Sequence, residues 1–84
     1  MPSSLRSPQQ QKLRETLIGA RKSADMTQTE LAARLKRPQS FVAKYELGER
    51  RVDVVEFAEI ARALGCDPLN LLGGYLEAIH AEGA

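Results

Sequence analysis

The sequence lacks features that would point to a membrane or secreted protein. It has no run of about 18 apolar residues, the length that a membrane-spanning helix needs. Its first residues lack the apolar stretch of a signal peptide. The single cysteine, Cys66, cannot form an internal disulfide, which fits a reducing compartment. These absences predict a cytoplasmic protein.

Patterns that carry catalysis or bind metals are also missing. The only histidine, His80, has no second ligand at metal spacing. No Ser/His/Asp, Cys/His or paired-carboxylate pattern suggests a catalytic centre. Gly73 and Gly74 lie in an apolar segment and do not make a phosphate-binding loop. We therefore expect that the protein is not an enzyme and that it binds no metal and no cofactor.

Positive charge is concentrated in the middle of the chain, although the net charge is only +1. Residues 1–33 carry +2, residues 34–51 carry +4 and residues 52–84 carry −5. The basic residues of the middle segment are Arg34, Lys36, Arg37, Lys44, Arg50 and Arg51. Local positive charge favours binding to a polyanion, because bound counterions are released. A solvated helical surface would show the same pattern, so charge alone does not decide between the two.

Apolar residues recur at helical spacing, and no segment has strand character, so we predict a single all-α domain of five helices. The first helix runs from Gln9 to about Ala24. A capping box, Thr27 with Glu30, begins the second helix. The third spans about 39–47 and stops at Gly48. The fourth begins after Asp53, with Glu56 three residues on, and the fifth begins at Asp67-Pro68.

Residues 27–47 are the most informative segment: two short helices joined by a tight turn, the second flanked by basic residues. A helix fits the major groove of DNA, where each base pair displays a distinct pattern of donors and acceptors. Gln39 and Ser40 are polar residues at the start of the second of these helices, and Lys44 lies one turn beyond Ser40. Phe41 has two open alternatives: it packs on a thymine methyl group or lies against the protein.

Four stretches of this chain resemble the helix-turn-helix of phage repressors and Cro, the XRE-like family. They are residues 26–32, 39–42, 46–50 and 60–65. The resemblance implies a compact five-helix lambda-repressor-like DNA-binding domain. It also implies that Gln28 binds a DNA phosphate, and that Gln39, Ser40 and Lys44 read bases or bind phosphate. The roles implied for the remaining residues are backbone contact by Arg50 and Arg51, and a partly buried salt bridge between Arg21 and Glu46.

Two positions depart from the family's pattern. Lys36 stands where the family often has glycine, and Pro38 where it often has a capping Ser or Thr. If residue 36 adopts a left-handed conformation, lysine costs about 1 kcal/mol that glycine would not. The presence of the two helices is unaffected, but their angle is less strongly specified.

The fifth helix has more apolar residues than one small core requires. We expect Leu69 and Leu72 to close the core, and a second set of residues to leave an apolar surface, namely Leu71, Tyr75, Leu76 and Ile79. A homodimer would cover that surface. We accordingly predict a flexible arm over residues 1–8, a helix-turn-helix DNA-binding domain over 9–72 and a C-terminal helix extension over 73–84 that is a candidate dimerisation segment.

The prediction from the sequence is a sequence-specific DNA-binding transcriptional regulator, a repressor that occupies a promoter. Two alternatives stay open. One is an antitoxin that binds DNA and a toxin partner, and the other is a protein-interaction module that does not bind DNA. The basic segment 34–51 argues against the second of these.

Overall fold

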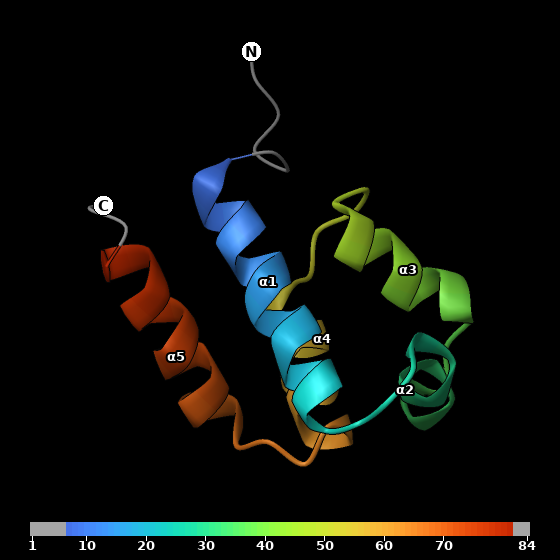
Figure 1. Ribbon diagram of the computed structural model, residues 1–84. Coiled ribbons are helices and arrows are strands. Elements are labelled where there is room, and N and C mark those ends of the chain that lie inside the picture. The colour runs from blue at the N-terminus through green and yellow to red at the C-terminus, as the bar shows by residue number, and fades with distance from the viewer. Residues whose placement is uncertain (1–6, 82–84) are drawn as a thin grey trace.

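The computed structural model describes residues 7–81, which contain five α-helices and no strand. The helices are α1 (Pro8–Ser23), α2 (Gln28–Leu35), α3 (Gln39–Leu47), α4 (Val54–Ala63) and α5 (Pro68–Ala81). The predicted all-α architecture of five helices is confirmed. In Figure 1, α5 lies on one side of α1, and α2 and α3 lie on the other. None of the helices in residues 7–81 is long and apolar enough to cross a membrane.

Capping side chains set the helix starts where the sequence predicted them. The Thr27 hydroxyl accepts a hydrogen bond from the backbone N–H of Glu30 at 3.0 Å, and the Glu30 carboxylate accepts one from the N–H of Thr27 at 2.8 Å. Asp53 and Glu56 form the same reciprocal pair at the start of α4, at 2.7 and 3.0 Å. Each box satisfies two backbone donors that a helix start otherwise leaves without partners.

The two ends of the chain differ in part from the predicted segments. Residues 1–6 of the predicted arm lie outside the described residues, as do residues 82–84. The rest of the arm belongs to α1, because Ser7 caps that helix and Pro8 is its first residue. At the other end, α5 runs without interruption through Gly73 and Gly74. The predicted boundary between residues 72 and 73 therefore falls inside a helix.

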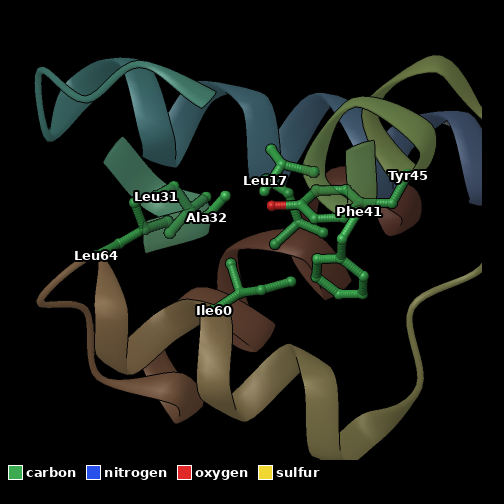
Figure 2. Close-up of a cluster of buried hydrophobic side chains, with 8 residues drawn as sticks. Leu17, Leu31, Ala32, Phe41, Tyr45, Ile60 and Leu64 are labelled. Atoms are coloured by element: carbon green, nitrogen blue, oxygen red, sulfur yellow. The ribbon is translucent and has the colours of Figure 1, made fainter. Parts of the chain in front are cut away.

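The core collects buried side chains from the first four helices around the aromatic residues of α3. Phe41 and Tyr45 pack edge to face, with ring centroids 5.5 Å apart. Figure 2 shows these two rings beside Leu17 of α1 and Ile60 of α4. The other buried members are Leu31, Ala32, Val42, Ala61 and Leu64. Because α3 contributes three of these side chains, its position is fixed mainly by burial of its inner face.

The core-facing side of α5 is not the one that the sequence predicted. Leu71 packs against the core, whereas Leu69 is 77% exposed and Leu72 is 39% exposed. The prediction for Leu69 and Leu72 was wrong because successive residues of a helix point about 100° apart, so a shift of one residue selects a different face. Leu69, Leu72 and Leu76 form an exposed row on α5, which we call the leucine row.

Candidate nucleic-acid interface

The turn between α2 and α3 uses two residues that are unusual for their positions. Lys36 ends α2 in the left-handed conformation, with φ 58° and ψ 42°. Pro38 precedes α3 with extended backbone and provides no side-chain hydrogen bond to cap that helix. Proline is compatible with this position because its ring fixes φ and it lacks only a donor that a helix start does not need. The turn therefore forms without the glycine and the capping hydroxyl that are common in the family.

The outer face of α3 is exposed and carries the residues that were predicted to meet DNA. Val42 and Tyr45 face the core, and this leaves Gln39, Ser40 and Lys44 exposed to solvent. Leu47, one turn beyond Lys44, is 61% exposed and was not among the predicted contacts. The outer face of α3, which is polar at its N-terminal end, is therefore accessible to a binding partner such as the major groove of DNA.

A chain of hydrogen bonds connects the start of α3 to α2. The Gln39 amide Nε2 donates to Gln28 Oε1 at 2.8 Å. Gln28 Nε2 in turn donates to Glu46 Oε1, also at 2.8 Å. Gln28 and Gln39 were predicted as separate contacts, but the structure places their side chains together. One bond therefore fixes the orientation of the Gln39 amide and two fix that of Gln28, and each amide keeps further capacity for a ligand.

This chain of hydrogen bonds ends at the ion pair between Arg21 and Glu46 that the resemblance implied. Arg21 Nε donates to Glu46 Oε2 at 2.8 Å, and Nη2 donates to Oε1 at 3.1 Å. A third guanidinium N–H, on Nη1, donates to the carbonyl of Met26 at 2.8 Å. The Arg21 side chain is 12% exposed and that of Glu46 is 6% exposed. Hydrogen bonding to Glu46 raises the pKa of Arg21, and burial opposes this shift. The charged pair connects α1 to α3 and holds the two helices together.

Of the two alternatives for Phe41, the structure has the one in which the ring lies against the protein. The residue is 8% exposed, belongs to the core cluster and lies beneath two arginine side chains. Its position near the start of α3 left a base contact open, but its ring is buried in the core cluster. The prediction of Phe41 as a DNA-contacting residue is therefore corrected: the ring belongs to the protein interior.

The two arginines of the loop after α3 have different surroundings. Arg50 Nη1 and Nη2 each donate to one oxygen of the Glu56 carboxylate at 3.1 Å. That bidentate bond occupies the part of the guanidinium that would grip a phosphate. Arg51 is exposed and makes no ion pair within residues 7–81. Of the two, Arg51 is the better placed for the predicted backbone contact.

Residue-by-residue reading of the sequence missed Arg37 and Glu56 as parts of this site. Arg37 Nη2 lies 3.2 Å from Glu59 Oε1, and its guanidinium lies over the Phe41 ring. Glu56 was identified only as the capping partner of Asp53. The chain holds no signal that would have revealed the second role, because Arg37, Arg50 and Glu56 meet only when the start of α4 lies against the segments before and after α3.

A family model and several solved structures place the chain among known proteins. A helix-turn-helix family model matches residues 17–71. An XRE-family like protein from Pseudomonas syringae pv. tomato str. DC3000 is 52% identical, with 84% of this chain and 85% of that chain covered and a TM-score of 0.78. The restriction-modification controller protein C.AhdI from Aeromonas hydrophila is 30% identical, with 71% and 91% covered and a TM-score of 0.65.

The same fold occurs in the restriction-modification controller protein C.Esp1396I, whose tetramer was solved in complex with its natural 35 base-pair operator. That structure is 17% identical, covers 84% of this chain and 93% of its own, and has a TM-score of 0.77. A search of curated protein sequences found no match. The matched helix-turn-helix segment and the relative with 52% identity together show that this chain belongs to the XRE-like helix-turn-helix family, a family of DNA-binding transcriptional regulators.

Proposed function

We propose that this protein is a sequence-specific transcriptional regulator, a repressor that inserts α3 into the major groove of an operator. The observation that carries the proposal is the exposed amide of Gln39, fixed by Gln28 at the start of α3. One Nε2 hydrogen of Gln39 is taken by Gln28, and the other hydrogen and the carbonyl oxygen remain. A donor beside an acceptor matches adenine, which presents the N7 acceptor and the N6 donor in the major groove.

The neighbouring side chains extend the contact from bases to backbone. Gln28 keeps one Nε2 hydrogen after its bond to Glu46, and that donor suits a phosphate oxygen. Ser40 can bond a base edge or a phosphate, and Lys44 suits guanine acceptors or a phosphate. The exposed Arg51 supplies a positive charge beyond the far end of the helix. Together these residues combine base reading with backbone attachment, as operator binding requires.

Repression and dimerisation are the finer parts of the proposal. Repression by occupancy needs only tight binding to a promoter, whereas activation needs a further contact with polymerase. The leucine row, with Leu69 at 77% and Leu76 at 50% exposure, supports a homodimer, because a second copy would remove these side chains from water. Two copies of α3 would then read half-sites about 34 Å apart. The proposal keeps the cytoplasmic location that was predicted from the sequence.

The test is selection of bound sites from a random duplex pool by the parent chain and two double variants. Gln39→Ala with Lys44→Ala removes an amide and a positive charge from α3. Gln11→Ala with Arg62→Ala removes the same kinds of group from exposed positions of α1 and α4. We expect the parent and the second variant to enrich one inverted repeat, and the first variant to enrich none. Failure of the parent to enrich any sequence would overturn the proposed function.

A further inference from the structure

Two guanidinium groups lie over the buried ring of Phe41, and they come from the segments that flank α3. The Cζ atom of Arg37, in the turn before α3, is 4.5 Å from the ring centroid. The Cζ atom of Arg50, in the loop after α3, is 4.7 Å from it. A cation near the face of an aromatic ring is attracted by the ring's quadrupole. Both segments that flank the helix are therefore held to one ring of that helix.

A single carboxylate of α4 joins the two arginines. Glu56 accepts both bonds of the bidentate pair with Arg50 at 3.1 Å, and its Oε2 lies 3.9 Å from Arg37 Nη1. The Glu56 side chain is 11% exposed, while those of Arg37 and Arg50 are 35% and 36% exposed. Glu59 also contacts Arg37, but it is 46% exposed and makes no ion pair with Arg50. We call Arg37, Phe41, Arg50 and Glu56 the arginine clasp.

We propose that Glu56 is a positioning residue for DNA binding, which acts through Arg37 and Arg50 to hold the turn before α3 and the loop after it in register with that helix. The inference rests on the proposed function, since it concerns the same surface. Gln39 lies two residues after Arg37, and Arg51 follows Arg50 directly. A fixed clasp keeps these two DNA-facing residues at a constant spacing, as simultaneous contact with one duplex requires.

The sign of the effect distinguishes positioning from charge. DNA repels a carboxylate, so the loss of a negative charge near a DNA-binding surface strengthens binding when electrostatics alone operates. A positioning role predicts the opposite result for Glu56. Glu56→Gln keeps the shape of the side chain and an oxygen that can still accept from the backbone N–H of Asp53. Glu49→Gln removes the same charge from an exposed residue next to Arg50 and leaves the contacts of Glu56 with Arg50 and Arg37 intact, so it is the matched control.

The experiment measures the affinity of the parent and each variant for the selected duplex and for a scrambled duplex of equal length. We expect Glu56→Gln to bind the selected duplex about two- to thirty-fold more weakly, the range seen for residues that act through others. Its binding to the scrambled duplex should stay equal or become tighter. Glu49→Gln should bind both duplexes as tightly as the parent or more tightly. Phe41→Leu, which removes the ring and keeps all charges, should weaken the selected duplex in the same direction as Glu56→Gln.

Circular dichroism at the assay temperature shows whether each variant is folded, and a variant that is unfolded there is assayed at a lower temperature. If the parent binds the selected duplex and folded Glu56→Gln binds it as tightly or more tightly, the positioning role is overturned and the proposed function stands. If Glu56→Gln weakens both duplexes equally, the residue has no part in specific docking and the inference also fails. If the parent binds no duplex, the proposed function fails, and the role of Glu56 in DNA binding fails with it.

Discussion

Gln39 and Gln28 are joined side chain to side chain across the turn of the helix-turn-helix, with Gln39 Nε2 2.8 Å from Gln28 Oε1. The bond connects α3, the helix proposed to enter the major groove, to α2, and Glu46 extends it to the ion pair with Arg21. An amide held in this way loses less rotational freedom when it meets a base than a free glutamine would. The two glutamines should therefore act as a unit.

Replacement of Gln28 tests that unit. Gln28→Ala should weaken operator binding by about 1–2 kcal/mol, because Gln39 loses its fixed orientation and one phosphate donor is lost. A double-mutant cycle with Gln39→Ala should give a coupling energy above about 0.5 kcal/mol, measured by fluorescence anisotropy on a labelled operator. Strict additivity of the two single changes would show that the hydrogen bond has no role in binding.

The ion pair between Arg21 and Glu46 should be costly to break from one side only. Glu46→Leu leaves the mostly buried guanidinium of Arg21 without its carboxylate and should lower the free energy of unfolding by about 3–5 kcal/mol. Changing both partners, with Arg21→Met added, should restore part of that loss. Urea unfolding followed by circular dichroism measures both values. A double variant no more stable than Glu46→Leu alone would contradict the stranded-charge argument.

Glu56 should make stability depend on pH in the acid range. Hydrogen bonds from Arg50 lower the pKa of Glu56, and burial opposes the shift only in part. A carboxyl whose pKa is lower in the folded state contributes stability above its unfolded pKa, about 4.3, and loses it as pH falls through the folded value. The stability difference between the parent and Glu56→Gln should thus be full near pH 6 and shrink below about pH 4. Melting temperatures across this range, with Glu59→Gln as the control, measure the effect, and a difference independent of pH would contradict it.

Replacement of Lys36 by glycine should stabilise the folded protein. Its φ of 58° is in the left-handed region, where a side chain costs about 1–2 kcal/mol that glycine does not. Lys36→Gly should therefore raise the free energy of unfolding by about 1 kcal/mol, less whatever the greater freedom of glycine in the unfolded chain takes back. Lys36→Ala, which keeps the side-chain cost and removes the charge, is the control. An equal gain from both changes would assign the effect to charge instead of backbone conformation.

The leucine row should determine the oligomeric state. Leu69→Glu places a charge on a side chain that is 77% exposed in the single chain, so the monomer should tolerate it while a dimer should not. Sedimentation equilibrium should give a dimer mass for the parent and a monomer mass for Leu69→Glu. Val54→Glu, at an 85% exposed position of α4, should leave the parent's mass unchanged. A parent that sediments as a monomer at every concentration would remove the homodimer from the proposal.

The helices could be predicted from the sequence because their ends are written in local chemistry. The Thr27–Glu30 and Asp53–Glu56 boxes, Gly48 and Asp67-Pro68 each act within a few residues, and all lie where the pattern predicted. The exposure of Gln39, Ser40 and Lys44 followed from helical periodicity in the same way. Interactions of this range need no knowledge of the tertiary fold.

Three features depended on tertiary packing and could not be predicted from the sequence. The predicted core-facing side of α5 was wrong, because Leu69, Leu71 and Leu72 are all leucine and only packing against the core selects Leu71. Arg50 looked like a free loop cation until α4 placed Glu56 beside it. Phe41 had two alternatives of equal standing, and the structure places its ring in the core cluster.

Helix α1 lies between α3 and α5 (Figure 1), and α5 makes its contacts with α1 and α4. In a dimer formed through α5, a substitution in the leucine row would change the distance between the two copies of α3 without touching a side chain that reads a base. A substitution on the outer face of α3 would change the preferred bases and leave the assembly intact. Half-site sequence and half-site spacing could therefore diverge independently as such a regulator evolves.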